Sequence, residues 1–151
     1  MKSSTKLFTI LMANDDSGFC VLMQEALSEV DLPVHFYAVH NGEKLLDYLY
    51  HRDPYADVTA FPTPDLILLD LNMPRVDGRE ALQRLKSDPK MRAIPIVVIT
   101  TSHQEEDIFN CYQAGVNSFL VKPMTFEKLV WMMQEVCRYW FELVCLPSCS
   151  S

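Results

Sequence analysis

The stretch that most constrains the fold of this chain is the segment PDLILLDLNMP, which begins at Pro64. Its apolar residues, Leu66 to Leu69, are uninterrupted, flanked by turn-forming residues and too few for a helix. Such a run is typical of a strand that is buried on both faces, as in parallel sheets. The run ends in an acid, Asp70. Because open α/β sheets bind their ligands at the carboxyl ends of the strands, Asp70 is a candidate functional residue.

Short apolar segments of the same kind recur along the chain, and each is followed by a segment with helical periodicity. In the helical segments, apolar residues are spaced three and four apart, as on one face of a helix. This alternation predicts a doubly wound α/β fold with a five-stranded parallel sheet and helices on both faces, placed alternately by right-handed crossovers. The other predicted strands cover residues 7–12, 34–39, 94–99 and 116–121.

Several helix starts are predicted from residues that favour the first turn. Asp77 with Glu80 three positions later has the form of a capping box, and the acidic run 105–107 suits the positive end of a helix dipole. Residues 51–64 are rich in proline and predict a long connector, which we interpret as a tolerated surface insertion. The remaining expected starts are Asp16 or Ser17, Asn41–Gly42, and Thr125.

Length and charge limit the organisation and the partners of the chain. A length of 151 residues predicts one domain, expected over residues 7–142 between an N-terminal extension (1–6) and a tail (143–151). The net charge of −7 argues against a broad nucleic-acid-binding surface. Neither a signal peptide nor a membrane-spanning run of ~18 apolar residues is evident, so a cytoplasmic protein with no membrane partner is expected.

The five cysteines are odd in number and scattered, which favours reduced thiols over a disulfide framework. Cys145 and Cys149 are spaced as a possible pair of metal ligands, but no second pair or nearby histidine completes a zinc site.

Polar residues stand at the ends of four predicted strands. They are the pair Asp15 and Asp16, then Asp70, Thr100 and Lys122. In a parallel sheet these ends emerge at one edge, where three carboxylates would repel each other without a cation, and oxygen ligands favour Mg²⁺. An ammonium and a hydroxyl complement phosphoryl oxygens, and a carboxylate can attack phosphorus. The sequence therefore predicts a magnesium-dependent phosphoryl site.

Together, these motifs resemble the receiver domain of bacterial two-component response regulators. The resemblance is carried by the acid pair, the DLNMPxxDG signature around Asp70, the TTS run from Thr100 and the FLVKP run that contains Lys122. It covers about residues 5–142 and implies the flavodoxin-like (βα)5 receiver fold. The long connector and the Asn-Met-Pro turn are similar to those of receivers that partner bacterial phytochrome-type histidine kinases.

The resemblance implies a role for each site residue. Asp70 would accept a phosphoryl group from a phosphohistidine of a sensor kinase, so the protein would be a phosphoacceptor rather than an enzyme acting on other substrates. Asp16 and Asp70 would bind Mg²⁺ directly together with the backbone carbonyl of Asn72, and Asp15 would act mostly through water.

Thr100 and Lys122 would hold the phosphoryl oxygens. Phe119 would be the switch residue, which turns inward as Thr100 is drawn toward the phosphate; many receivers have tyrosine there. The Lys122–Pro123 bond is often cis in the family. Asn72 and Ser102 occupy positions that tune hydrolysis of the acyl phosphate in this family.

No effector domain follows in this sequence, so output through binding or phosphate relay is expected. The family's usual contact surface runs over the fourth helix, the fifth strand and the fifth helix, and it could support a homodimer. Trp131 is expected to lie on the exposed side of the last helix, where it could contact a partner.

Two other functions are less consistent with the sequence. A haloacid-dehalogenase-type phosphatase also uses a strand-end aspartate, but it needs a second acid two residues later as general acid, where this chain has Asn72. A binding module that keeps the fold but is never phosphorylated is disfavoured by the intact set of acids, threonine and lysine.

Overall fold

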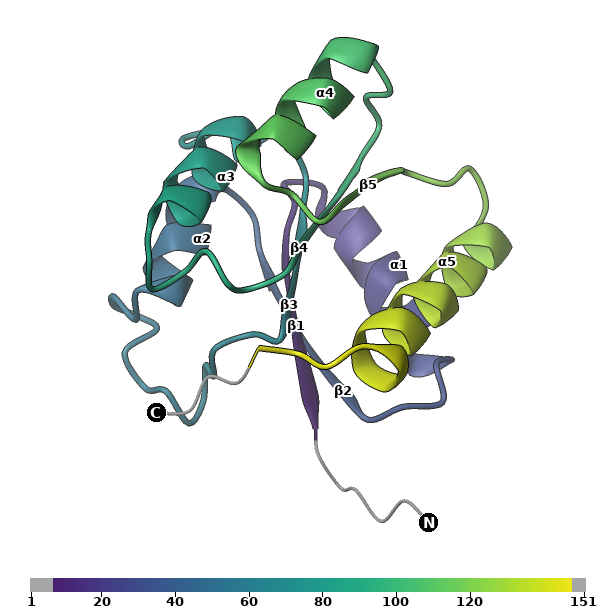
Figure 1. Cartoon of the computed structure of the whole chain (residues 1–151). Coiled ribbons are helices and arrows are strands. Elements are labelled where there is room, and N and C mark those ends of the chain that lie inside the picture. Colours follow the sequence, from purple (N-terminus) through teal and green to yellow (C-terminus); the bar gives the residue numbers. More distant parts are fainter. Residues whose placement is uncertain (1–6, 148–151) are drawn as a thin grey trace.

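The computed structural model describes residues 7–147 of the chain. The expected N-terminal extension (1–6) and residues 148–151, with Cys149, lie outside the described residues. In the described part, strands and helices alternate as predicted (Figure 1). The strands are β1 (Phe8–Ala13), β2 (Val34–Val39), β3 (Leu66–Leu69), β4 (Ile96–Thr100) and β5 (Ser118–Val121). The helices are α1 (Ser17–Ser28), α2 (Gly42–Leu49), α3 (Gly78–Ser87), α4 (Glu105–Ala114) and α5 (Phe126–Arg138).

The five strands that the structure describes form one parallel sheet in the order β2-β1-β3-β4-β5. This is the flavodoxin-like order, and it confirms the predicted fold class. Because the central strand β3 pairs with β1 on one side and β4 on the other, Asp70 emerges in the middle of the sheet edge. That position brings it next to the ends of both neighbouring strands.

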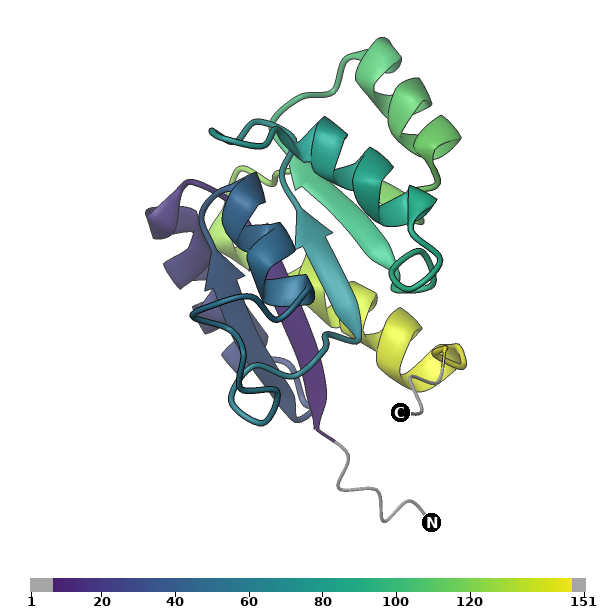
Figure 2. The ribbon, with the colours of Figure 1, turned by 90° about the vertical axis from the view of Figure 1, so that its left-hand side faces the viewer.

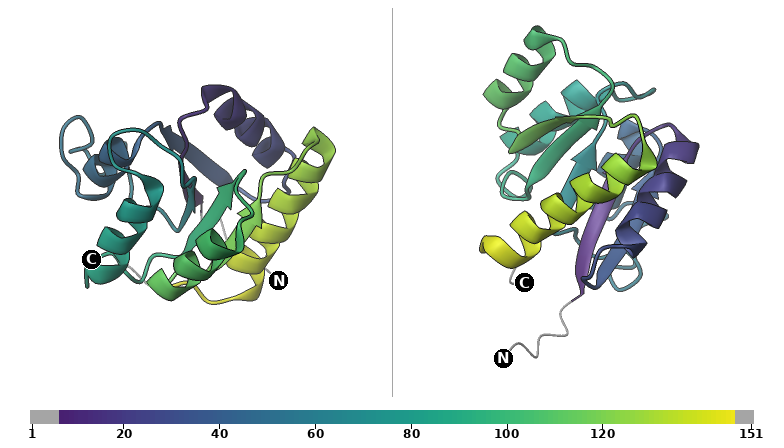
Figure 3. Two further views of the ribbon diagram at one scale, coloured as in Figure 1. Left: turned by 90° about the horizontal axis from the view of Figure 1, so that it is seen from above. Right: turned by 90° about the vertical axis from the view of Figure 1, so that its right-hand side faces the viewer.

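The helices cover both faces of the sheet, but they do not alternate one by one. Helices α1 and α5 pack on one face, and α2, α3 and α4 on the other (Figures 1 and 3). The expectation of strict alternation was therefore wrong. Right-handed crossovers that progress in the same direction across the sheet place their helices on the same face. The crossover from β1 to β2 runs one way, and those from β2 to β5 run the other way.

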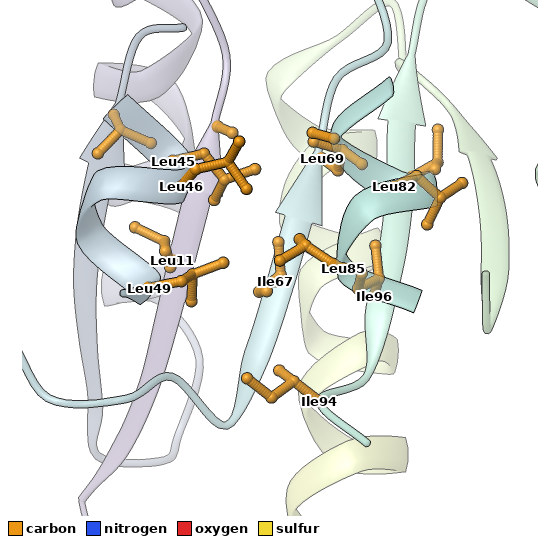
Figure 4. Packing of buried hydrophobic residues seen from close by; sticks show 14 of the residues in the cluster. Leu11, Leu45, Leu46, Leu49, Ile67, Leu69, Leu82, Leu85, Ile94 and Ile96 are labelled. Atoms are coloured by element: carbon orange, nitrogen blue, oxygen red, sulfur yellow. The ribbon is translucent and has the colours of Figure 1, made fainter. Parts of the chain in front are cut away.

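Side chains of the sheet alternate between two apolar layers. In β1, Leu11 and Ala13 pack toward α2 and α3, whereas Ile10 and Met12 pack toward α1 and α5. In β3 every residue from Leu66 to Leu69 is buried, as predicted for a strand covered on both faces. Figure 4 shows the first layer, in which leucines of α2 and α3 meet the inward side chains of the sheet. Figure 2 looks onto the helices that cover it.

Most of the helix starts follow the sequence. The carboxylate of Asp16 accepts a hydrogen bond from the N–H of Phe19 at 3.1 Å, and Thr125 caps α5 in the same way. Asp77 caps α3 through the N–H of Arg79 at 2.8 Å. In a capping box the side chain of Asp77 would instead accept a bond from the N–H of Glu80, one residue later. After α5 a π-helical turn continues to Leu143, and none of the described helices could cross a membrane.

The connector between α2 and β3 belongs partly to the core. Phe61 of the connector packs edge-on against Tyr55 and against Tyr48 of α2, Tyr55 packs at a tilt against Tyr48, and Phe61 also contacts Tyr37 of β2. The buried hydroxyl of Tyr48 donates a hydrogen bond of 2.8 Å to the carbonyl of Pro62. The interpretation of this segment as a mere surface insertion therefore needs correction, because its aromatic rings are part of the apolar layer.

The bond from Tyr48 gives a direct test of how the connector is held. Tyr48→Phe removes one buried hydrogen bond while keeping the ring, so we expect a loss of about 1 kcal/mol in the free energy of unfolding, measured by urea denaturation. Tyr139→Phe changes an exposed tyrosine and should shift that free energy by less than about 0.5 kcal/mol. Equal losses in the two variants would contradict this account.

Candidate functional site

The sheet register brings the predicted site residues to one edge. Ala13 pairs with Leu69, and the N–H of Asp70 donates to the carbonyl of Ala13 at 2.9 Å, so Asp70 lies beside the acid pair that follows β1. On the other side, the carbonyl of Thr100 accepts a 2.7 Å hydrogen bond from the N–H of Lys122. The backbone pairing therefore assembles the strand ends as the sequence predicts.

Asp70 and Thr100 are buried at this edge. The side chain of Asp70 is 6% exposed and Thr100 is fully buried. Within residues 7–147 the Thr100 hydroxyl has no hydrogen-bond partner. A buried hydroxyl without a partner is costly, and it points to a group that this hydroxyl contacts only in another state of the protein. The Nδ2 amide group of Asn14, between β1 and the acid pair, is in the same situation.

The acid pair follows β1 in a loop that is fixed by its own hydrogen bonds. The side chain of Asn14 accepts a bond from the N–H of Asp16 at 2.8 Å, and Asp16 then caps α1. Both Asp15 and Asp16 are exposed. The pair therefore presents carboxylate oxygens to solvent at the rim, above the buried Asp70.

The thiol of Cys20, in the first turns of α1, responds to the charges of the whole site. Burial raises the pKa of this thiol to about 11, and Asp16, Asp15 and Asp70 add to the rise while Lys122 opposes it. Asp15 and Asp16 follow β1, Asp70 follows β3 and Lys122 follows β5, so residues from three strand ends influence the pKa of this one thiol.

Lys122 follows β5 and reaches the first turn of α1, the helix that begins directly after the acid pair. Its ammonium nitrogen is 4.2 Å from the centre of the Phe19 ring, which is a cation–π contact. A neutral ring orients the ammonium without neutralising it, so the charge stays available to an anion. The expectation of a cis Lys122–Pro123 bond was wrong for this structure, in which the cis peptide among the described residues is Asp53–Pro54.

Two side chains that the sequence did not single out connect the loops of the site. Arg79, the second residue of α3, makes a two-pronged ion pair with Asp107 of α4, with both nitrogen–oxygen distances at 2.9 Å. Arg79 also approaches Asn72 at 3.4 Å, and the hydroxyl of Ser102 donates to Asp107 at 2.8 Å. These four residues form a polar bridge from the β3–α3 loop to the β4–α4 loop. We call it the Arg79–Asp107 bridge.

The bridge could not be recognised from local patterns. Asp107 is part of an acidic helix start, for which the helix dipole is a sufficient explanation. Arg79 is a single basic residue in the first turn of a helix, where it has no recognisable motif around it. Their pairing depends on the sheet order, which places β3 beside β4 and therefore α3 beside α4.

Comparison with known proteins places the chain in a family. The family model of the response regulator receiver domain matches residues 10–134. The chain belongs to the response regulator receiver family. The resemblance stated from the motifs is thereby confirmed, together with its place in two-component signalling.

Individual relatives are similar over almost the whole chain. Response regulator Rcp1 of Synechocystis is 36% identical over 139 residues, which is 92% of each chain. The structure of a phosphorylated cyanobacterial phytochrome response regulator, RcpA, is 36% identical and superimposes with a TM-score of 0.87, covering 95% of this chain and 100% of that one. A Mn²⁺-bound form of Rcp1 gives a TM-score of 0.84 at 35% identity, covering 93% and 99%.

The signature of this receiver includes a glycine for a steric reason. A Cβ atom at position 78 would lie 2.1 Å from the carbonyl oxygen of Asp70 and 2.7 Å from Cα of Leu71. Only glycine permits so close an approach. The start of α3 is therefore packed against the backbone of Asp70, which fixes the height at which its carboxylate emerges.

The predicted switch residue of the receiver, Phe119, is partly buried against the layer that includes α2 and α3. Its backbone N–H donates a 3.1 Å hydrogen bond to the hydroxyl of Tyr112 on α4. A tyrosine hydroxyl thus lies next to the switch position, although it comes from α4 rather than from residue 119.

The donor set of the site suits a hard cation. All candidate ligands are oxygens, from Asp15, Asp16, Asp70 and the backbone, and such sets favour Mg²⁺ or Mn²⁺. Among residues 7–147, no three histidine, cysteine, aspartate or glutamate side chains converge closely enough to hold one metal ion by themselves.

The bridge should make stability depend on pH in acid. Hydrogen bonds from Arg79 and Ser102 lower the pKa of Asp107 below its ordinary value of 3.8. Since the folded-state pKa is the lower one, the ionised carboxylate stabilises the fold above about pH 3.8, and this contribution is lost as the pH falls toward the folded-state pKa.

Urea unfolding of the native protein and Asp107→Asn over a series of pH values measures this effect. The native protein should have a higher free energy of unfolding than Asp107→Asn. This difference should be constant near neutrality and should become smaller below about pH 4. Asp31→Asn, at an exposed acid between α1 and β2, serves as the control. A difference that did not narrow in this window would contradict the role assigned to Asp107.

Proposed function

We propose that this receiver accepts a phosphoryl group on Asp70 from a phosphohistidine of a sensor kinase, in a Mg²⁺-dependent reaction. The observation that carries the proposal is the arrangement of three groups at one sheet edge. The nearly buried carboxylate of Asp70 lies at the same sheet edge as Lys122 and as the Thr100 hydroxyl, which has no partner within residues 7–147. A phosphoryl group on Asp70 would give that hydroxyl and the Lys122 ammonium the anionic partner that they can bind.

The transfer requires only groups at this edge. One carboxylate oxygen of Asp70 attacks phosphorus, the bond from phosphorus to the histidine nitrogen breaks, and the nitrogen keeps the electron pair. Lys122 and the Thr100 hydroxyl hold the phosphoryl oxygens and stabilise their charge. The backbone of Asp70 cannot retreat during the attack, because Gly78 packs against it.

The proposed metal ligands are the carboxylates of Asp16 and Asp70 and the backbone carbonyl of Asn72, with Asp15 acting through water. This set uses two carboxylates directly, which is compatible with the lack of a three-carboxylate cluster in residues 7–147. A bound Mg²⁺ would neutralise the phosphoryl oxygens and the crowded acids. The Mn²⁺-bound form of the relative Rcp1 supports a divalent cation in proteins of this kind.

The proposed partner is a histidine kinase of the phytochrome type, because relatives such as RcpA are described as phytochrome response regulators. Phosphorylation would draw Thr100 toward the phosphoryl group and move the β4–α4 loop, with Phe119 turning inward. The signal would then reach partners through α4, β5 and α5.

Intact mass spectrometry after exposure to acetyl phosphate tests the proposal. The native protein with Mg²⁺ should gain one phosphoryl group, and the gain should disappear in Asp70→Asn and after chelation of the metal. Asp31→Asn should behave like the native protein, because Asp31 is exposed in the loop between α1 and β2.

Lack of any gain in the native protein would contradict the proposed function and favour a phosphorylation-independent binding module. A gain that persisted in Asp70→Asn would place the acceptor elsewhere.

We also propose a homodimer through α4, β5 and α5. Large apolar side chains gather there in exposed positions, although exposed apolar side chains on a protein of this size are usually scattered. Trp131, predicted to be exposed, is 54% exposed on α5. The other members of this surface are Phe109, Tyr112, Val121, Met124, Phe126 and Tyr139.

Sedimentation velocity of the phosphorylated protein checks the dimer. Phe109→Glu places a charge on the exposed apolar surface of α4, so we expect the dimer fraction to fall about tenfold or more. Val58→Glu introduces the same charge at a similarly exposed valine in the connector and should leave the dimer unchanged. Monomers in all three proteins would refute the dimer but not the phosphoryl reaction.

A further inference from the structure

We propose that Arg79 and Asp107 are positioning residues that prolong the life of the phosphoryl group on Asp70, an inference that rests on the proposed function. Their bridge runs over the sheet edge where the reaction would occur. At one end it reaches Asn72, two residues after Asp70, and at the other end Ser102, two residues after Thr100. The two loops that leave the reacting strand ends are therefore connected by side chains of α3 and α4.

The bridge is built to hold its geometry. The guanidinium of Arg79 meets both carboxylate oxygens of Asp107, at 2.9 Å each, and its third nitrogen lies 3.2 Å from Asp77, the residue that caps α3. Two-pronged arginine–carboxylate pairs fix orientation as well as distance. The Asp107 side chain is only 16% exposed, so solvent screens the pair less than an ordinary surface pair.

Helix α4 has little buried surface of its own, so the bridge is an important contact for it. Of the α4 residues, Cys111 alone is buried, and Gln104 at the N-cap makes no side-chain capping bond within the described structure. A hollow lined by Arg79, Leu82, Asp107 and Cys111 separates α3 from α4 beside the bridge. In the first turn of α4, Asp107 connects the helix to Arg79 of α3 and to Ser102 of the preceding loop.

The consequence for chemistry concerns water. Hydrolysis of the acyl phosphate needs a water oxygen to attack phosphorus while the bond from phosphorus to the Asp70 oxygen breaks, which returns the carboxylate and releases inorganic phosphate with the proton from water. Asn72 and Ser102 stand on the two loops that leave the acceptor strand β3 and the neighbouring strand β4, and we place the path of this water between them. Held by the bridge, they restrict its entry; released, they let the β4–α4 loop open.

The test is the rate of hydrolysis of the phosphorylated protein after the acetyl phosphate has been removed, followed by intact mass. Arg79→Ala and Asp107→Ala should each raise the rate constant roughly threefold or more, and the double variant should be no faster than the faster single variant, because the pair acts as one unit. Arg84→Ala is the matched control. It removes an arginine of the same helix that pairs with Glu80 at 2.6 Å on the solvent side, and it should leave the rate unchanged.

Ser102→Ala provides an independent measurement, since it removes one hydrogen bond to Asp107 and leaves the ion pair intact. The rate constant of hydrolysis should rise in this variant too, but by less than in Arg79→Ala. If a melting experiment shows that an ion-pair variant folds poorly, Ser102→Ala still tests the inference. Unchanged or slower hydrolysis in Asp107→Ala and Ser102→Ala, or equal acceleration in Arg84→Ala, would overturn the inference. A native protein that never gains a phosphoryl group would refute the proposed function, and this inference with it.

Discussion

The burial of β3 between two apolar layers is the constraint on which the rest of the structure depends. Every side chain from Leu66 to Leu69 is enclosed, so the strand can neither slide nor turn over without exposing apolar surface. The next residue, Asp70, therefore leaves the core at a defined height and in the middle of the sheet. Gly78 presses α3 onto its backbone from above. The acceptor position is thus fixed by hydrophobic packing below and steric contact above.

The site assembled at this position is not optimised for stability. Asp15 and Asp16 follow β1 and Asp70 follows the neighbouring strand β3, and the Thr100 hydroxyl is buried without a partner in the described structure. Without a bound cation the neighbouring carboxylates repel one another, and without an acceptor the buried hydroxyl lacks a hydrogen bond, so both features cost free energy. The large double-layered core can tolerate this cost. Such locally unfavourable features are expected at sites where a protein binds a ligand.

Much of the fold could be predicted from the sequence because its elements are specified locally. Apolar runs gave the strands, and capping residues such as Asp16 and Thr125 gave the helix starts. The distribution of helices over the two faces could not be obtained this way, since it depends on the strand order. The connector was also misjudged, because the burial of Tyr55 and Phe61 depends on a surface that only the folded sheet provides.

The candidate site likewise contains residues that could be predicted from the sequence and residues that could not. Residues at strand ends were predictable, since parallel strands deliver them to a common edge whatever their neighbours are. The partnership of Arg79 with Asp107 was not, because it joins two helix starts that are distant in sequence and adjacent only through the pairing of β3 with β4. Contacts between helices carry no signature in either helix alone.

The β3–α3 loop and the β4–α4 loop differ in how firmly they are packed, and this difference indicates which part of the molecule can move. The β3–α3 loop is packed against α2 as well, because a Cβ atom at Gly42 would lie 1.9 Å from the carbonyl oxygen of Val76. The β4–α4 loop leads instead to a helix with little buried surface. A shift of Thr100 toward a ligand would therefore be transmitted to α4, because a helix with little buried surface costs less to displace than a well-packed one. The same helix carries Tyr112, which bonds to the backbone of Phe119. A change at the buried site thus has a short physical route to the exposed apolar side chains of α4 and β5.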